Sequence, residues 1–280
     1  MEDSDDPVLM EVSEGVALLT LNRPDNMNTM TQPLWHALLA RLEDCSEDDA
    51  VRAIVITGQG RAFCAGADKV RLRKWANGEE IDLPTESPRV KVPKGLDLPP
   101  GFDDRFSYLT TVPKPIIAAI NGPAAGTGFI LSLYSDIRFA AESAKMTTAF
   151  ARLGLIGEMA LPWMLTRTTS PQVASDLLFS ARVVTGAEAE KMGLVNRALP
   201  QDELMPFVMD YARQVAATGS VWSQARLKEQ IYRGLVQDIE AAVNEYYPLM
   251  YESLTSDDYR ERLRAMLAAV EGKSKAKATA

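Results

Sequence analysis

The first part of the chain shows two hydrophobic patterns in succession. Residues 8–22, VLMEVSEGVALLTLN, alternate between apolar and polar positions, and the alternation breaks at Glu14 and Gly15. A period of two is that of a half-buried strand, so we expect a β-hairpin that turns at these two residues. Residues 31–48 instead space their leucines as a helix does, behind Thr31, a favourable N-cap. This segment predicts an amphipathic helix.

Continuous apolar runs indicate buried strands further along. Residues 51–57, VRAIVIT, and 115–122, PIIAAING, are rich in β-branched side chains and each leads to a glycine-rich turn. Helix and strand patterns then alternate as far as residue 199, which is typical of an α/β protein. The remaining helical patterns lie at 102–112, 202–217, 222–233, 236–253 and 256–270.

The two glycine-rich turns are the first candidate for chemistry. They read GQGRAFCAGADK at 58–69 and NGPAAGTG at 121–128, and each passes from a predicted strand to a predicted helix. A strand that breaks at glycine and leads into a helix leaves backbone N–H groups at a positive helix terminus. If the two turns face each other, they can provide a pair of donors for one developing negative oxygen, an oxyanion hole.

Composition narrows the function classes. The chain has 280 residues, of which 46% are hydrophobic and 24% charged, as in a globular protein. Its net charge of −8 argues against nucleic-acid binding, and no run of 18 apolar residues predicts a membrane span. The acidic amino-terminal residues do not resemble a secretory signal, and two cysteines make no disulfide framework. We therefore expect a cytoplasmic protein with reduced thiols.

His36 is the only histidine, and it lies within the predicted helix at 31–48. Ser-His-Asp and Cys-His mechanisms would both depend on this one residue, whose position among helical leucines is that of a surface or core side chain. A histidine-rich metal site is excluded as well, so we expect no metal.

The amino-acid sequences of the two turns resemble those of the crotonase (enoyl-CoA hydratase/isomerase) superfamily. RAFCAGAD and NGPAAGTG carry the resemblance, and NRPDNMN, ARLGLIGE and TGAEAEKMGLVNRAL follow the family order. The resemblance implies an α/β fold, a crotonase-like spiral of β-β-α units over residues 1–200. It also implies a C-terminal helical region, 201–280, that packs against neighbouring subunits in a homotrimer or a dimer of trimers. The implied substrate is an acyl-coenzyme A thioester, with coenzyme A as part of the substrate and no permanently bound cofactor.

The same resemblance assigns roles to residues at the turns. It places the oxyanion-hole donors on the N–H groups of Ala67 and Thr127, the latter where the family usually has glycine. Further substrate contacts are expected at Ala65, Gly66, Asp68 and Gly126. Arg23, in the NRPDNMN segment, resembles a contact to a phosphate or the adenine of coenzyme A, and a solvated turn arginine is the alternative.

The sequence departs from the hydratase pattern at two positions. Hydratases of the family carry two glutamates that hold one water. The two glutamates would fall at Ile130 and Arg152, so both carboxylates are missing here. We expect these two residues only to contact the substrate. Arg152 could pair with Glu158, bind a carboxylate of the substrate, or point to solvent. Glu158 is the remaining acid, at a position where some isomerases of the family carry a catalytic carboxylate. Its apolar neighbours Leu155 and Ile156 should desolvate it and raise its pKa, whereas a helix N-terminus would lower it.

A single carboxylate favours double-bond isomerisation, or related one-carboxylate chemistry, over hydration. Enoyl-CoA hydration, as in fatty-acid β-oxidation, and a non-catalytic acyl-CoA-binding paralogue remain as alternatives. Residues 77–104 contain five prolines and form a long loop, which the resemblance places over the acyl pocket.

Overall fold

The computed structural model describes residues 6–79, 89–92 and 94–278, with side chains described as far as Val270. The strands are β1 (Val8–Ser13), β2 (Val16–Leu21), β3 (Ala53–Gly58), β4 (Ile116–Ile120), β5 (Ala124–Ala125), β6 (Ile137–Ala141), β7 (Lys145–Thr147), β8 (Val184–Thr185) and β9 (Arg197–Leu199). The α-helices are α1 (Gln32–Glu47), α2 (Lys69–Ala76), α3 (Thr127–Leu133), α4 (Leu161–Thr168), α5 (Pro171–Ser180), α6 (Gly186–Lys191), α7 (Gln201–Thr218), α8 (Val221–Arg233), α9 (Ile239–Thr255) and α10 (Asp257–Ala278). Short 3₁₀ helices lie at η1 (Pro24–Asn26), η2 (Ser107–Thr111) and η3 (Phe150–Leu153).

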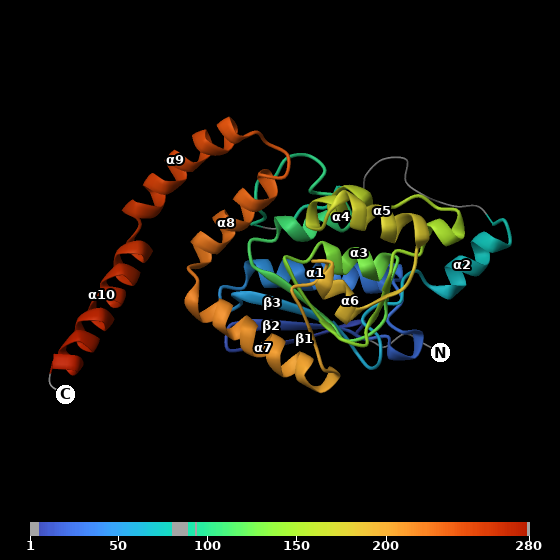
Figure 1. Cartoon of the computed structure of the whole chain (residues 1–280), viewed down its shortest axis with the longest axis horizontal. Coiled ribbons are helices and arrows are strands. Elements are labelled where there is room, and N and C mark those ends of the chain that lie inside the picture. The colour runs from blue at the N-terminus through green and yellow to red at the C-terminus, as the bar shows by residue number, and fades with distance from the viewer. Residues whose placement is uncertain (1–5, 80–88, 93, 279–280) are drawn as a thin grey trace. The chain divides into compact units, whose positions relative to one another are not determined.

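The main sheet has six strands in the order β1-β2-β3-β4-β6-β9 (Figure 1). Its first pair is the predicted hairpin, antiparallel with Ser13 opposite Val16, and the other pairs are parallel. Glu14 and Gly15 both have positive φ, at 50° and 78°, which matches the twist that a two-residue hairpin requires. The prediction from alternation is thus confirmed.

The central strands are buried on both faces. Every residue of β3 and β4 is buried, which explains why their sequences are continuous apolar runs rather than alternating ones. Helix α7 packs across β2, β3, β4, β6 and β9, and α1 packs on β1 and β2. Figure 1 shows these two helices on opposite sides of the strands. Strands β5, β7 and β8 form a small second sheet next to α3.

The helical pattern at 102–112 is only partly realised. Only Ser107–Thr111 is helical, as the 3₁₀ helix η2, and all five of its residues are buried. An α-helix of that length would place one face in solvent, whereas this segment is enclosed, with Tyr108 and Leu109 fully buried. Before it, Val90 and Leu96 are tied by backbone hydrogen bonds to Asp103 and Thr111. Residues 80–88 of the predicted loop lie outside the described residues.

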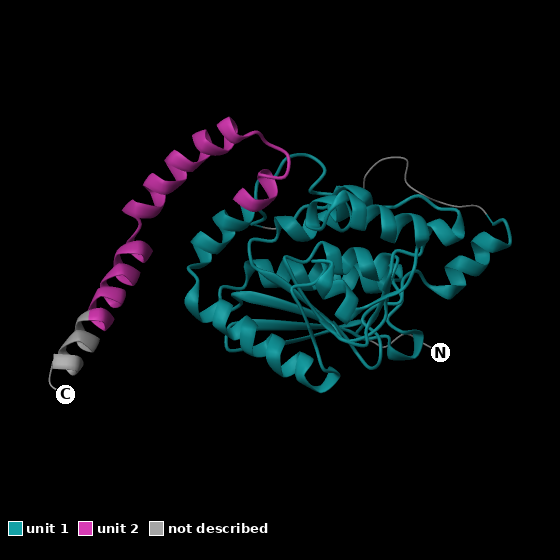
Figure 2. Cartoon of the chain, viewed as in Figure 1, with its two compact units in different colours: residues 1–229 teal, residues 230–280 magenta. Residues whose placement is uncertain are grey.

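The chain forms two compact units, residues 1–229 and 230–280 (Figure 2). We expected a helical region from residue 201, but the contacts of α7 with five strands make it part of the first unit. The second unit contains the end of α8 together with α9 and α10. None of the described helices combines the length and the apolar character needed to cross a membrane.

A buried ion pair fastens α8 to the sheet. The Lys228 ammonium donates to the Asp136 carboxylate at 2.8 Å and to the backbone oxygens of Leu109 and Lys114 at 3.0 and 3.2 Å. The two charged side chains are only 6% and 17% exposed. Burial lowers the pKa of Lys228, and the charge of Asp136 opposes that shift.

Replacing Lys228 with Met should therefore destabilise the fold strongly. The variant leaves the Asp136 carboxylate without this cation, and breaking a buried pair typically costs about 3–5 kcal/mol. Urea denaturation of both proteins measures the loss in free energy of unfolding. Arg182→Met is the control, because Arg182 pairs with Asp176 on the exposed surface, where solvent screens the charges and a much smaller loss is expected. Equal losses in the two variants would contradict the role of the buried pair.

Candidate active site

The two glycine-rich turns lie side by side, as predicted. The N–H of Cys64 donates to the Pro123 oxygen at 3.1 Å, and the N–H of Ala125 donates to the Cys64 oxygen at 3.1 Å. Strands β3 and β4 are parallel neighbours, so both turns begin at the carboxyl ends of the strands, on the same side of the sheet. The sheet topology therefore brings the segments 61–68 and 121–128 together.

Close approach of the turns depends on Gly128 in the first turn of α3. A Cβ built at this position would lie 1.9 Å from the Cys64 oxygen and 2.7 Å from its carbonyl carbon. Backbone atoms cannot move aside cheaply, so only glycine lets α3 begin against the first turn.

The two expected donors both have N–H groups available to a ligand. Thr127 is the first residue of α3, where a helix has no internal acceptor for the N–H. Ala67 follows Gly66, whose φ of 103° turns the chain and whose oxygen accepts from the N–H of Met30. Within the described residues, neither the Ala67 nor the Thr127 N–H donates a hydrogen bond.

Threonine is tolerated at position 127 because the preceding residue carries the unusual backbone. Gly126 has φ 49° and ψ −113°, a conformation that glycine adopts readily and β-branched residues avoid. Thr127 itself begins the helix and does not have a positive φ. A side chain at 127 thus leaves the backbone donor in place.

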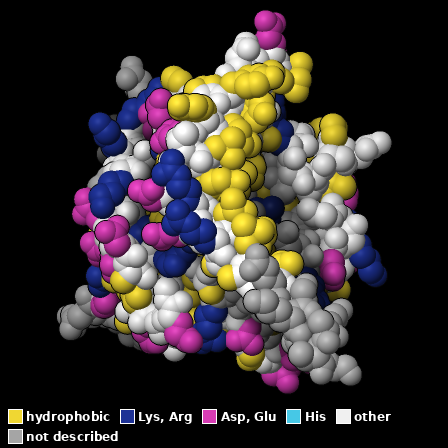
Figure 3. All heavy atoms as spheres, turned by 90° about the vertical axis from the view of Figure 1, so that its left-hand side faces the viewer, with side chains coloured by type: hydrophobic (Ala, Val, Ile, Leu, Met, Phe, Trp, Pro, Cys, Tyr) yellow, Lys and Arg dark blue, Asp and Glu magenta, His cyan; other side chains and the backbone are white. Residues whose placement is uncertain are grey.

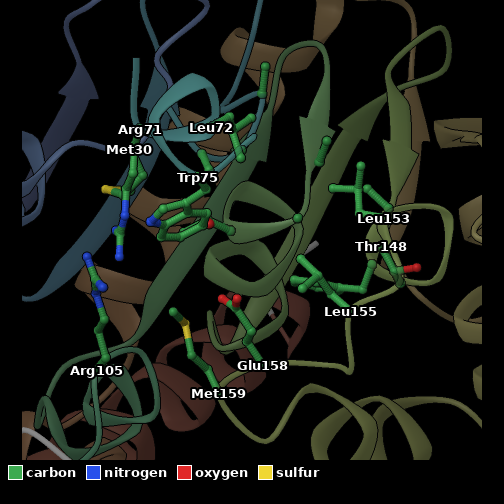
Figure 4. Close-up of a pocket in the computed structure, with 18 of the residues that line it drawn as sticks. Met30, Arg71, Leu72, Trp75, Arg105, Thr148, Leu153, Leu155, Glu158 and Met159 are labelled. Atoms are coloured by element: carbon green, nitrogen blue, oxygen red, sulfur yellow. The ribbon is translucent and has the colours of Figure 1, made fainter. Parts of the chain in front are cut away.

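A pocket of about 530 Å³ opens in front of both turns (Figure 4), a volume in the range of ligand sites. Six of the residues expected at the site line it: Ala65, Gly66, Ala67, Gly126, Thr127 and Glu158. The sequence thus located one wall of the pocket and the acid that faces it.

Glu158 stands on a fixed and strained turn. The next two residues, Met159 and Ala160, both have φ of 52°, which is costly outside glycine. The turn is held by the Tyr134 hydroxyl, which donates to the Met159 oxygen at 2.9 Å, and by the Leu161 N–H, which donates to the Glu158 oxygen. Such strain recurs at functional sites, and here it aims Glu158 into the pocket (Figure 4).

The expected desolvation of Glu158 is corrected in part. Its side chain is half-buried, because Ile156 and Leu155 do not enclose it and are themselves 84% and 44% exposed. Nor does Glu158 lie in the first turn of a helix, since α4 begins at Leu161 with Ala160 as its N-cap.

Two expected substrate contacts do not reach the pocket. Ile130 is fully buried in α3 and packs into the core. Arg152 is exposed on η3 and is absent from the pocket lining. Neither hydratase position therefore faces the cavity that Glu158 lines.

Arg23 and Asp68 form a buried structural pair beside the pocket. The Arg23 guanidinium donates to the Thr29 oxygen at 2.6 Å and lies 3.4 Å from the Asp68 carboxylate. Burial tends to raise the pKa of Asp68, but the Val70 N–H and the charge of Arg23 outweigh it, and the pKa is lowered. Asp68 also caps α2 by accepting from Val70, as expected of an acid at a helix start. Both side chains stand outside the pocket lining, so a coenzyme A contact stays a prediction.

Sequence reasoning missed the opposite wall. Arg71 and Trp75 of α2 line the pocket together with Asp104 and Arg105. Helix α2 has a polar, basic sequence, and the apolar spacing at 102–112 predicts a helix, so no motif marks these residues. Burial and the nearby Arg71 lower the pKa of the Arg105 guanidinium, while Glu158 and Asp104 oppose that shift.

Neither cysteine thiol has the properties of a nucleophile. Cys64 is fully buried, and burial raises its pKa to about 11; the pKa of Cys45 is raised to about 12, mainly by burial. A thiolate is therefore disfavoured at both positions. Among the described residues no group of three His, Cys, Asp or Glu side chains could hold a metal ion.

Comparisons with known proteins agree with this architecture. Residues 11–275 match the family model described as enoyl-CoA hydratase/isomerase. The 1,2-epoxyphenylacetyl-CoA isomerase of Escherichia coli (strain K12) is 31% identical over 261 residues, which cover 93% of this chain and 95% of that one. A probable enoyl-CoA hydratase of Rhodobacter capsulatus is 33% identical over 259 residues, covering 92% and 93%.

Solved structures show the same fold. A probable enoyl-CoA hydratase/isomerase from Mycobacterium abscessus superposes with a TM-score of 0.81 at 26% identity, covering 94% of this chain and 96% of that one. A monofunctional enoyl-CoA isomerase from M. smegmatis gives 0.68 at 31% identity, covering 85% and 98%. These matches confirm the crotonase-like α/β fold, and the chain belongs to the enoyl-CoA hydratase/isomerase family.

Proposed function

We propose that the protein is an acyl-CoA isomerase that moves a double bond by proton transfer through Glu158. The observation that supports this most directly is the pocket itself. It joins two backbone N–H groups without acceptors to one glutamate, and both hydratase positions lie outside it. Two of the relatives described above, the E. coli and M. smegmatis proteins, are also named isomerases.

In the proposed reaction the thioester carbonyl accepts from the N–H groups of Ala67 and Thr127. The ionised Glu158 takes the α-proton of a 3-enoyl thioester, and the electron pair spreads onto the carbonyl oxygen as an enolate. The protonated Glu158 then gives a proton to the γ-carbon, and a 2-enoyl thioester forms. The N–H groups stabilise the oxygen where charge develops. Coenzyme A enters only as part of the substrate, and this chemistry needs no permanently bound cofactor.

The function is tested by offering 3-enoyl-CoA thioesters of several chain lengths to the purified protein. Conversion to the conjugated 2-enoyl product raises ultraviolet absorbance and is the expected result. Catalytic formation of a 3-hydroxyacyl product from 2-enoyl-CoA, without isomerisation, would instead establish a hydratase.

Hydration is the second candidate because the pocket contains another acid. Asp104 lines the cavity with Glu158, and two carboxylates can divide the work of base and acid on one water. The sequence did not reveal this residue, which stands at neither hydratase position.

We also propose self-association through the C-terminal helices, as a trimer or a dimer of trimers. Ile239, Val243, Tyr246, Met250 and Leu254 follow helical spacing on α9, and each is at least 40% exposed. Met266, Leu267 and Val270 of α10 are exposed as well. Figure 3 shows the hydrophobic side chains gathered in a stripe on this face. An apolar stripe of this length commonly marks a protein interface.

Light scattering tests this proposal. We expect wild-type protein at three or six times the chain mass, and a smaller species when Val243 and Met250 are both replaced by Glu, because charges oppose burial at an interface. The control is Glu252→Gln, an exposed change on the same helix that should preserve the assembly. A wild-type monomer at micromolar concentration would contradict self-association.

A further inference from the structure

Two arginines converge on one side of the pocket. Figure 4 shows the guanidinium ends of Arg71 and Arg105 facing each other, while the Glu158 carboxylate enters from another side. The two side chains come from separate elements, α2 and the segment before η2, and both are half-buried. Like charges repel, and although the carboxylates of Glu158 and Asp104 oppose this repulsion at Arg105, the pKa of Arg105 is still lowered.

Neither arginine forms a direct ion pair within the described residues. The Nε of Arg105 is buried and has no hydrogen-bond acceptor there. A buried guanidinium donor without an acceptor is costly, and a bound ligand is one partner that can satisfy it.

Aromatic rings hold both guanidinium groups by their faces. Arg71 lies 4.5 Å from the centre of the Trp75 ring, and Arg105 lies 5.1 Å from that of Trp35. A cation–π contact is made by the positive charge with the face of the ring, and it uses none of the N–H donors as hydrogen bonds to an acceptor oxygen. The N–H donors of a guanidinium group form a fork to which a carboxylate can bind with both of its oxygens.

We propose that the pocket takes acyl-CoA thioesters whose acyl chain carries a second, distal carboxylate, bound by Arg71 and Arg105. This inference rests on the proposed function, because it assumes that the thioester carbonyl occupies the donors at Ala67 and Thr127. The acyl chain then runs through the lined cavity toward α2 and Arg105. Binding of a substrate carboxylate was one alternative for Arg152, and we assign it instead to Arg71 and Arg105.

Binding of saturated thioesters tests the inference without any catalysis. Isothermal titration calorimetry compares pentanoyl-CoA with glutaryl-CoA and hexanoyl-CoA with adipoyl-CoA, pairs that differ in the terminal carboxylate. We expect the carboxylated member of at least one pair to bind about tenfold more tightly to wild-type protein, as charge-assisted hydrogen bonds imply. Arg105→Gln and Arg71→Gln should each reduce that preference to about twofold or less. Arg73→Gln, an exposed change on the same helix, should keep it.

The phosphates of coenzyme A are the other possible anion for these arginines. Pantetheine thioesters of the same acyl groups lack those phosphates and should show the same preference and the same losses. Equal weakening of both members of each coenzyme A pair, with no effect on the pantetheine thioesters, would assign the arginines to phosphate and overturn the proposal. Equal binding of both members to wild type would overturn it while leaving the isomerase function standing. Failure of every thioester to bind would overturn the function too.

Discussion

Glu158→Gln is expected to lower kcat for the conversion of 3-enoyl-CoA to 2-enoyl-CoA by about 10²- to 10⁴-fold, the usual contribution of a positioned acid–base group. The amide has nearly the same shape and can still occupy the strained turn at 158–160, but it can neither take nor return a proton. Binding of a saturated acyl-CoA should change little, because the thioester is held by backbone N–H groups. Stopped-flow absorbance and calorimetry measure the two quantities separately.

Asp104→Asn is the matched control for this variant, since Asp104 lines the same pocket. In an isomerase with one proton carrier, its loss should leave kcat within about tenfold of wild type, well short of the loss of a positioned acid–base group. Full activity in Glu158→Gln would remove the residue from the mechanism. Equal, large losses in both variants would instead indicate two-carboxylate chemistry and favour hydration.

The second large effect is expected from Thr127→Pro. Proline has no N–H, and it is well tolerated at the first position of a helix, where Thr127 stands at the start of α3. The change therefore removes one donor while preserving the helix. Loss of one oxyanion-hole donor typically costs about 2.7–4 kcal/mol, or 10²–10³ in kcat.

Thr127→Ala and Thr127→Gly keep the N–H and serve as controls, with rates expected close to that of wild type. A large loss in Thr127→Ala would show that the hydroxyl matters, and an unaltered rate in Thr127→Pro would place the oxyanion elsewhere. Circular dichroism and thermal melting of each variant establish that the fold is intact.

Much of the fold could be predicted from the sequence because local pattern and tertiary structure agree there. The alternation at 8–22 gave the hairpin, and the β-branched runs before Gly58 and Asn121 gave the central parallel strands. The segment 102–112 failed because its apolar spacing reflects enclosure in the core rather than one helical face.

The pocket also has one part that could be predicted from the sequence and one part that could not. The wall that carries the Ala67 and Thr127 donors was predictable from the sequence. Its backbone requires glycine at 66, 126 and 128, and these glycines are visible as a motif. The opposite wall was not predictable, because Arg71 and Arg105 meet only through tertiary packing and belong to no motif. The solvent exposure of Glu158 likewise depended on how Leu155 and Ile156 are oriented, which spacing alone does not determine.

The most direct test of the account is the mass of the product formed from 3-enoyl-CoA in D₂O, with wild-type protein and Glu158→Gln side by side. A single carboxylate that carries one proton predicts a 2-enoyl product with no water added and at most one deuterium gained per turnover, formed about 10²- to 10⁴-fold more slowly by Glu158→Gln. Addition of one D₂O across the double bond, or unchanged turnover in Glu158→Gln, would contradict it.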